Sequence, residues 1–333
     1  MKTCLALLLL LCCTIQLHAQ KPEQLGYKPF TIKDAKLGEV HYYVSQKNID
    51  TPLGILLYID GSGAFPLFQH TARGTMSTIP LDMQAMGNKY HVIIISKPGV
   101  PFIDSVQRDP VTGAPTYNAP QEYTQRLSLQ WRADAADAVL KDAMKQIPCN
   151  KAHIAIMGIS EGFQVGAKLL GMNKSITHAL LYVGNGLSQL YDFTQQQRAD
   201  AIAGKITHEQ AQQNIDSIAQ VFKDILTYPE ATDKEWYGHT YKRWSSFGSY
   251  VPANDILKTN IPLYIVAAMK DHNSSVAGTD YLYIESIRQG KKNIDFKFYP
   301  YDHYFNEYGE DGKPTGNHTL DVVNEGMAWL EKH

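Results

Sequence analysis

The 333-residue sequence has few cysteines and little net charge, and each shortage excludes a class of protein. Three of the four cysteines, Cys4, Cys12 and Cys13, fall in an apolar N-terminal run. The remaining Cys149 cannot form an internal disulfide alone, so the hydrophobic core must supply the stability. The formal net charge is -2 and no block of like charges occurs, which gives no indication of a nucleic-acid partner.

Metal-binding and membrane-spanning patterns are also missing. No His-Glu-x-x-His motif occurs and no Cys/His spacing is typical of a zinc site, so we expect no metal and no other cofactor. The longest apolar run, at the N-terminus, is too short to span a bilayer comfortably. We therefore expect no membrane span.

The N-terminal run has the organisation of a secretory signal peptide. Lys2 supplies a positive start, Leu5–Leu11 is almost entirely leucine, and Leu17-His18-Ala19 offers a small residue for cleavage. We expect residues 1–19 to be removed, with cleavage after Ala19 or Gln20, and the mature protein to be secreted or periplasmic. A lipid anchor is the alternative, although neither cysteine near the end of the run follows the small residue that lipidation signals usually show.

Apolar runs alternate with helical patterns from residue 50 onwards. Runs that are apolar throughout are typical of parallel strands covered on both faces. Five such strands are expected, at Gly54–Ile59, Tyr90–Ile95, His153–Met157, Ala179–Val183 and Pro262–Ala268, and Asp295–Tyr299 is expected as the last strand. Between and after them, the spacing predicts helices over 121–146, 281–289 and 320–332, while 40–44 alternates like an antiparallel edge strand. The sequence predicts an α/β fold, a mostly parallel central sheet with helices on both faces.

Residues 186–250 interrupt this alternation, because a simple crossover needs far fewer residues. Thr207–Gln210 has the pattern of a capping box, and Thr232–Glu235 has a second. We expect a helical cap inserted into one domain that spans 20–333. Most of its aromatic residues should form a small core of their own: Trp236, Tyr237, Tyr241, Trp244 and Phe247.

The pentapeptide Gly158-Ile159-Ser160-Glu161-Gly162 gives the clearest indication of chemistry. It reads Gly-x-Ser-x-Gly and lies between the strand at 153–157 and a helix that begins near Phe163. Strand, tight turn and helix in this order are the context of a nucleophile elbow, where the serine takes a strained backbone conformation. A side chain at either glycine would strike the neighbouring strand or helix. Ser160 is therefore the candidate nucleophile.

A serine hydroxyl needs a base to take its proton and an acid to orient that base. In sheet-based hydrolases the acid and then the histidine follow the serine, on loops beyond the ends of strands. Asp271 follows the strand at 262–268 and His303 follows the last strand, so we expect Asp271 as acid and His303 as base. Two acids and two histidines are weaker candidates: Asp255, Asp280, His272 and His318.

The charge that develops on the substrate oxygen needs two backbone N–H donors, an oxyanion hole. One is expected from Glu161, directly after the nucleophile. The other is expected from the turn Asp60-Gly61-Ser62-Gly63, where Ser62 or Gly63 would donate. Glu161 and Arg243 are also candidates for binding a charged substrate end, with a structural or solvated charge as the alternative.

These residues resemble the α/β-hydrolase superfamily over nearly all of the mature length, and most closely its dienelactone-hydrolase and prolyl-oligopeptidase-like branch. The resemblance rests on Gly158–Gly162, the Asp60–Gly63 turn, Lys270-Asp271 and Asp302-His303. It implies a triad of Ser160, Asp271 and His303. Many members have His-Gly where this turn has Asp60-Gly61, but donation through the backbone should survive that change.

An exported serine hydrolase that cleaves a small-molecule ester through an acyl-enzyme is the function we expect. A prolyl-oligopeptidase-like serine peptidase acting on short peptides is one alternative, since some Gly-x-Ser-Glu-Gly enzymes resemble peptidases. A catalytically inactive binding protein of the same fold is another. The choice of substrate is expected to lie in the 186–250 insertion and the 98–118 loop.

Overall fold

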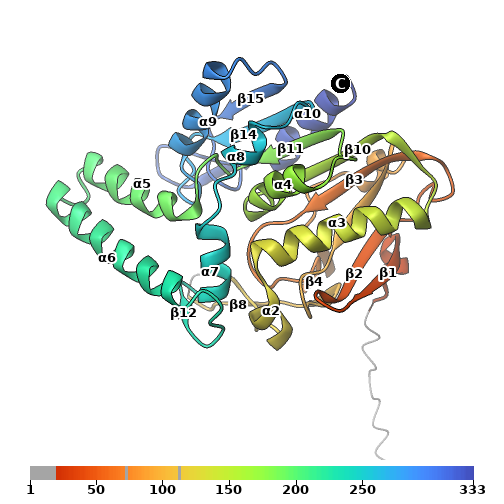
Figure 1. Cartoon of the computed structure of the whole chain (residues 1–333), viewed down its shortest axis with the longest axis horizontal. Coiled ribbons are helices and arrows are strands. Elements are labelled where there is room, and N and C mark those ends of the chain that lie inside the picture. The colour runs from red at the N-terminus through yellow and green to blue at the C-terminus, as the bar shows by residue number, and fades with distance from the viewer. Residues whose placement is uncertain (1–19, 72–73, 112–113) are drawn as a thin grey trace, which may run out of the picture.

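An eight-stranded sheet runs through the molecule in the order β1-β2-β6-β3-β10-β11-β14-β15 (Figure 1). The computed structural model describes residues 20–71, 74–111 and 114–333, so the expected signal peptide at 1–19 lies outside the described residues. Within the described part, no helix combines the length and apolar character needed to cross a membrane.

Six neighbouring strands of the sheet are parallel: β6 (Tyr90–Ile95), β3 (Leu53–Ile59), β10 (Cys149–Ile159), β11 (His178–Tyr182), β14 (Leu263–Ala268) and β15 (Ile294–Tyr299). β2 (Gly38–Ser45) is antiparallel to β6, as predicted for 40–44. Its predicted edge position was wrong, because β1 (Tyr27–Asp34) pairs with its outer side. Most of β1 is exposed, so the strand carries no continuous apolar run.

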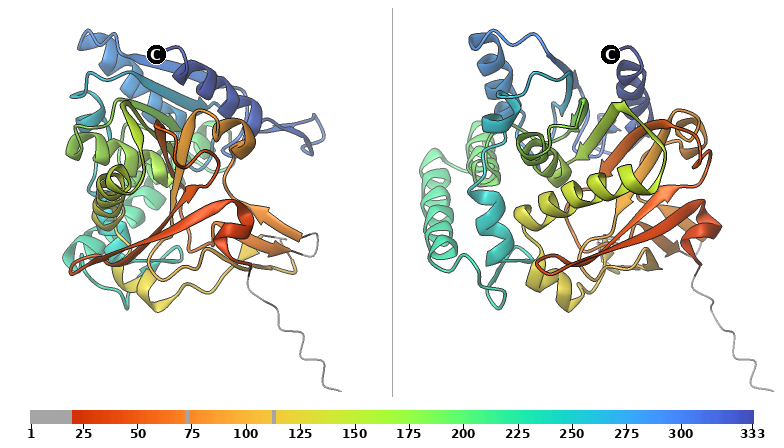
Figure 2. Two further views of the ribbon diagram at one scale, coloured as in Figure 1. Left: turned by 90° about the vertical axis from the view of Figure 1, so that its right-hand side faces the viewer. Right: turned by 45° about the vertical axis from the view of Figure 1, so that its right-hand side comes forward.

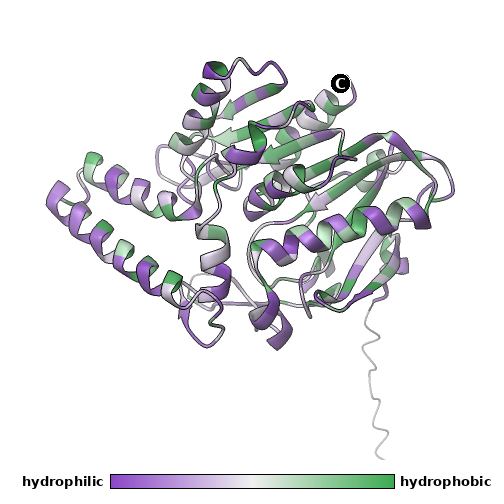
Figure 3. Cartoon of the chain, in the orientation of Figure 1, coloured by the Kyte–Doolittle hydropathy of each residue, from purple (hydrophilic) through white to green (hydrophobic). Residues whose placement is uncertain are grey.

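The central strands are buried on both faces, which explains why their sequences do not alternate. In β3, Ile55 and Leu57 pack into one core, while Leu56 and Tyr58 pack into a second core across the sheet. α3 (Leu129–Gln146) and α4 (Glu161–Met172) cover the first face, and α10 (Thr319–Leu330) covers the second (Figure 2). Hydrophobic residues accordingly fill these strands (Figure 3).

The single helix predicted over 121–146 is two helices. α2 (Gln121–Arg126) ends at Leu127, whose backbone is extended with φ -60° and ψ 122°. Ser128 then caps α3, its Oγ accepting a hydrogen bond from the N–H of Trp131 at 3.0 Å. α9 (Val276–Arg288) begins earlier than the predicted 281, because Ser275 caps it.

Between β11 and β14 the chain forms α5 (Gln189–Ile202), α6 (His208–Thr227), the hairpin β12 (Glu235–Trp236) and β13 (His239–Thr240), α7 (Tyr241–Gly248) and α8 (Ala253–Ile256). α5 and α6 pack together and extend to one side of the sheet (Figure 1). The capping box predicted at Thr207 opens α6. The one predicted at Thr232 was wrong, because Glu235 begins the β12–β13 hairpin.

The aromatic residues of this insertion separate into three groups. Trp236, Tyr241 and Trp244 join Phe222 in a small core, as expected. Phe247 instead packs into the core on the face of the sheet that α3 and α4 cover. Tyr237 is 71% exposed.

Short elements complete the described chain. They are a 3-10 helix (Pro22–Leu25), α1 (Met83–Met86), the small sheet of β4 (Phe68–Thr71), β5 (Gly74–Ser77) and β7 (Ile103–Ser105), the pair β8 (Gln107–Arg108) and β9 (Pro115–Thr116), and the hairpin β16 (Asn306–Tyr308) and β17 (Pro314–Asn317).

Candidate active site

Ser160 lies in the turn between β10 and α4, with φ 57° and ψ -119°. A Cβ on Gly158 would lie 2.2 Å from the carbonyl oxygen of Gly162, and a Cβ on Gly162 would lie 2.1 Å from that of Ile59. Neither contact is possible without moving the backbone. The two glycines are therefore required by the close approach of α4 to the strands, as the sequence indicated.

His303 joins Ser160 to Asp271 in one hydrogen-bonded chain. Its Nε2 lies 3.0 Å from Ser160 Oγ, and its Nδ1 lies 2.7 Å from Asp271 Oδ2. The other Asp271 oxygen accepts from the backbone N–H groups of Asn273 and Ser274, at 2.7 and 2.8 Å. The side chains of Asp271 and His303 are 1% and 9% exposed, so water competes weakly for these bonds. This geometry allows the serine proton to pass to Nε2 while the carboxylate holds the opposite N–H.

The three residues follow the carboxyl ends of three parallel strands, β10, β14 and β15. The weaker candidates make other contacts. Asp255 in α8 accepts from Tyr250, Asp280 is exposed on α9, and His318 stacks on Tyr301. His272 lines the same pocket as Ser160, but the ring nitrogen at hydrogen-bond distance from the serine belongs to His303.

Ser160 and His303 line a pocket of about 730 Å³. Much of its wall comes from the insertion, through α5, the β12–β13 hairpin and α7. These elements supply aromatic and amide side chains: Phe193, Tyr237, Trp244, Gln189, Gln196 and Gln197. Pro115 from the 98–118 loop also lines the pocket. Both segments expected to choose the substrate therefore line the pocket that contains the candidate nucleophile.

The architecture matches solved structures of low sequence identity. The acylaminoacyl peptidase of Pyrococcus horikoshii is 12% identical, with a TM-score of 0.56 over 92% of this chain and 41% of its own. An esterase of Pyrococcus furiosus is 13% identical, with a TM-score of 0.52 over 94% of this chain and 91% of its own. A putative dienelactone hydrolase of Klebsiella pneumoniae is 14% identical, with a TM-score of 0.53 over 92% and 99%.

The chain has the α/β-hydrolase fold. It spans less than half the length of the acylaminoacyl peptidase. No family model and no curated protein matches the sequence. The fold predicted from the residues is thus confirmed at the level of architecture.

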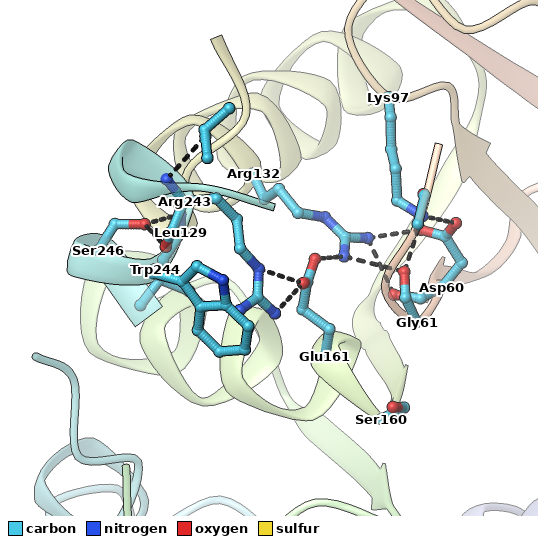
Figure 4. Close-up of polar contacts among 12 residues, drawn as sticks. Asp60, Gly61, Lys97, Leu129, Arg132, Ser160, Glu161, Arg243, Trp244 and Ser246 are labelled. Atoms are coloured by element: carbon cyan, nitrogen blue, oxygen red, sulfur yellow. Dashed lines mark hydrogen bonds and ion pairs between the residues drawn. The ribbon is translucent and has the colours of Figure 1, made fainter. Parts of the chain in front are cut away.

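In this α/β-hydrolase fold the residue after the serine is buried in an ion-pair cluster (Figure 4). Glu161 is 2% exposed, and its carboxylate binds Arg132 at 2.7 Å and Arg243 at 2.6 Å. Burial alone would raise the pKa of Glu161, but the guanidinium groups of Arg243 and Arg132 outweigh it and hold that pKa well below its usual value. Glu161 is therefore a structural charge with both carboxylate oxygens paired, whereas Arg243 is only partly paired, because its buried Nη1 has no partner among the described residues and the residue lines the pocket.

The pKa values of two further residues that line the pocket are shifted. Burial, with the nearby charge of Arg243, lowers the pKa of His239 to about 4, so its ring is neutral at pH 7. Burial raises the pKa of Asp192 to about 7, and the charge of Asp271 adds to this shift. Asp192 Oδ1 accepts from Asn185 Nδ2 at 2.7 Å and from the Ser275 N–H at 2.8 Å, which ties α5 to the loop after Asp271. Sequence reasoning missed Asp192, because an aspartate on an amphipathic helix is usually a solvated charge.

The two expected sources of oxyanion donors both lie next to Ser160. Glu161 is the first residue of α4, so its N–H belongs to the donors that a helix leaves unpaired at its start. A Cβ on Gly61 would lie 3.3 Å from Ser160 Cβ, which brings the Asp60–Gly63 turn against the nucleophile. Of the described residues, Gly61 and Ser62 line the pocket and Gly63 does not. This placement favours Ser62 over Gly63 as the second oxyanion donor.

The described residues also bear on metal binding. Within 20–71, 74–111 and 114–333, no three His, Cys, Asp or Glu side chains are grouped so that they could hold a metal ion.

Cys149 is the first residue of β10 and is a free, partly buried thiol whose pKa is raised by burial.

Proposed function

We propose that this protein is an exported serine hydrolase that cleaves a carboxylic ester through an acyl-enzyme. The observation that carries the proposal is the hydrogen-bonded chain from Ser160 Oγ through His303 to the buried Asp271, at the wall of a large pocket. Similar folds that are named as esterase, dienelactone hydrolase and peptidase support the hydrolase class.

In the proposed reaction Ser160 Oγ attacks the ester carbonyl carbon while its proton moves to His303 Nε2. His303 then gives that proton to the leaving alcohol as the C–O bond breaks, which leaves an acyl group on Ser160. Water attacks the acyl carbon, its proton passes through His303 to Ser160 Oγ, and the acid is released. Asp271 holds the imidazole throughout, and the N–H groups of Glu161 and Ser62 bind the negative oxygen.

The pairing of Glu161 argues against a substrate that is recognised there by a free amino terminus. Glu161 and Arg243 bind each other, and His239 is neutral at pH 7 because burial lowers the pKa of its ring. A peptidase that recognises a free amino terminus needs an unpaired carboxylate to bind it. A neutral ester needs no charged partner in the pocket, so we propose an ester rather than a peptide as the substrate.

A serine peptidase remains the second candidate, on one observation. Four glutamine side chains line the pocket, and an amide both donates and accepts hydrogen bonds as a peptide backbone does: Gln164, Gln189, Gln196 and Gln197. A panel of p-nitrophenyl esters against acylated and free aminoacyl-nitroanilides distinguishes the two. Turnover of nitroanilides that equals or exceeds that of the esters would favour the peptidase.

Substitution of the serine tests the reaction itself. Ser160→Ala is expected to abolish hydrolysis of activated esters and labelling by a fluorophosphonate, with the circular dichroism spectrum unchanged. Ser217→Ala, on the exposed face of α6, is the control and should keep both. Unchanged turnover in Ser160→Ala would refute the mechanism. Failure of the unmodified protein to react with the fluorophosphonate would favour an inactive binding protein.

Export is tested on the natural host. The proposal expects the protein outside the cytoplasm, with an N-terminus at Gln20 or Lys21 when the mature chain is sequenced. A chain that retains Met1 and fractionates with the cytoplasm would refute export and leave the catalytic proposal standing.

A further inference from the structure

The Asp60–Gly63 turn is held from behind by two buried cations. Lys97 follows β6 and is 5% exposed, and Arg132 lies on α3 and is 6% exposed. The Lys97 ammonium donates to Asp60 Oδ2 at 2.5 Å, to the Gly61 carbonyl at 2.7 Å and to the Gly63 carbonyl at 2.8 Å. An ammonium has three N–H donors, so all of them are used on this turn.

Arg132 adds a second set of bonds to the same turn. Its Nη2 donates to the carbonyl and the carboxylate of Asp60, and its Nη1 lies 3.4 Å from the Gly61 carbonyl. The same Nη1 donates to Glu161 at 2.7 Å. One guanidinium therefore spans the two segments from which the oxyanion donors are expected, the turn and the start of α4.

The direction of these bonds decides where the N–H groups of the turn point. In a trans peptide the C=O of one residue and the N–H of the next point in opposite directions, and the described chain has no cis peptide. The Gly61 carbonyl points toward Lys97 and Arg132, so the N–H of Ser62 points away from them. In Figure 4 the two cations lie on one side of Gly61 and Ser160 lies on the other.

We propose that Lys97 and Arg132 are positioning residues of the oxyanion site, which fix the Gly61–Ser62 peptide so that the Ser62 N–H faces the carbonyl oxygen under attack. This inference rests on the proposed serine-hydrolase function. It selects Ser62 rather than Gly63 as second donor, because the peptide unit that carries the Gly63 N–H has its carbonyl on Ser62, to which neither cation bonds. The sequence alone did not distinguish Ser62 from Gly63 as the second donor.

A cluster of this kind also resists rearrangement during the reaction. Three cations and two carboxylates, Lys97, Arg132, Arg243, Asp60 and Glu161, bind one another out of contact with most water. A donor that is already oriented need not reorganise when the negative charge forms, and this is what makes an oxyanion site effective. Without the two cations the glycine-rich turn could rotate its peptides at little cost.

The test removes the bonds that Lys97 makes to the turn without changing the net charge of the cluster. Lys97→Met alone leaves Asp60 short of a partner and could destabilise the fold. The double substitution Lys97→Met with Asp60→Asn removes one cation and one anion together, and the oxygen of the new amide can still accept from Arg132. Lys141→Met with Asp137→Asn is the matched control, because it removes a lysine–aspartate pair from α3 that touches no carbonyl of the turn.

The readouts are kcat and KM for p-nitrophenyl esters, and the inhibition constant of a trifluoromethyl ketone, which forms a tetrahedral adduct with an oxyanion. Rates are counted per site by complete fluorophosphonate labelling. The double variant should lose about 10- to 100-fold in kcat with KM changed less than about threefold, and the ketone should bind weaker by a similar factor. A merely structural role would lower the melting temperature and leave the ketone affinity unchanged.

A folded double variant whose kcat and ketone affinity stay within about twofold of the parent overturns the inference, as does a fall in kcat without weaker ketone binding. Failure of the underlying function has a different signature. If Ser160→Ala keeps its turnover, the serine mechanism itself is wrong, whatever Lys97 does. If Ser160→Ala is inactive and the double variant is unaffected, only the positioning role is wrong.

Discussion

Arg243 of α7 donates two hydrogen bonds to Glu161, the residue directly after Ser160, from Nε at 3.2 Å and from Nη2 at 2.6 Å. Its guanidinium also packs over the rings of Trp244 and Phe247, at 4.3 and 4.5 Å from their centres. The inserted segment is thus tied to the turn that carries the candidate nucleophile. A shift of α7 would therefore act, through Arg243, on Glu161 at the start of α4.

The Glu161→Gln substitution tests how much the fold depends on this tie. Gln keeps the shape but loses the charge, which leaves Arg132 and Arg243 buried without that carboxylate. Removing one member of a buried ion-pair network destabilises proteins by about 3–5 kcal/mol, and we expect a loss of that order in the free energy of unfolding. Urea denaturation followed by circular dichroism measures it.

Glu285→Gln is the control for that measurement. Glu285 pairs with Arg288 on the solvent side of α9, three residues away. Exposed pairs of this kind contribute little, so the unfolding midpoint should stay where it is. Equal effects of Glu161→Gln and Glu285→Gln would contradict a structural role for the buried cluster.

Asp271→Asn is expected to leave the fold intact and remove most of the activity. The asparagine oxygen can still accept from Asn273 and Ser274, which places its amide NH₂ against His303 Nδ1. A donor there forces the proton of His303 onto Nε2, so the ring cannot accept the serine proton. Comparable changes lower kcat by about 10⁴-fold, and we expect a loss of roughly 10³-fold or more in kcat for p-nitrophenyl esters.

Asp280→Asn provides the comparison for Asp271, since Asp280 is an aspartate of α9 that the sequence also offered. It is exposed and should keep full kcat. If Asp280→Asn were the variant that loses activity, the assignment of Asp271 as the acid would be wrong.

The residues of the hydrogen-bonded chain could be found from the sequence because each follows a recognisable strand. The carboxyl ends of parallel strands meet at one edge of the sheet, so placing Ser160, Asp271 and His303 after strands also places them near one another. Their order along the chain then indicated a role for each. No comparable rule brings Lys97, Arg132 and Arg243 together.

Those cations come from a strand end, a helix and the insertion, and their meeting depends on how three elements pack. Arg132 reads as one more polar residue on an amphipathic helix, and only the structure shows that its side chain is buried. The break between α2 and α3 was missed for a related reason, because Leu127 and Trp131 keep their helical spacing across it. Ser128 was the available signal, since serine is a preferred helix N-cap.

The elbow glycines give a prediction about folding. Gly162→Ala would bring a Cβ to 2.1 Å from the Ile59 carbonyl oxygen, so β3 and α4 must separate. We expect a loss of about 3 kcal/mol or more in the free energy of unfolding, or no folded protein. Gly204→Ala is the control: φ is +72° there but nothing lies within 4 Å of the new Cβ, so only about 1 kcal/mol of backbone strain is expected. Equal losses would contradict the steric requirement at Gly162, whose φ is not in the left-handed region, because Gly204→Ala measures backbone strain alone.

Asp192 gives a prediction about pH. Burial raises its pKa in the folded protein to about 7, whereas an unfolded chain releases the proton near the ordinary pKa of 3.8. Between these values the folded state binds more protons than the unfolded state, so this group's contribution to stability falls as the pH rises from about 4 to 7 and is constant above that range. Asp192→Asn removes this penalty, and its oxygen can still accept from Asn185 and Ser275.

The variant should therefore become more stable than the parent as pH rises from 4 to 7, by a few kcal/mol at most, since one pKa unit corresponds to roughly 1.4 kcal/mol. Urea midpoints at pH 4.5, 6 and 8 measure the difference. Asp200→Asn, on the same helix, should show the opposite sign: the pKa of Asp200 is lowered by its hydrogen bond to Lys205, so it stabilises the fold at neutral pH and loses that effect only in acid. A difference between Asp192→Asn and the parent that does not change between pH 4.5 and 8 would show that Asp192 titrates alike in the folded and unfolded chains.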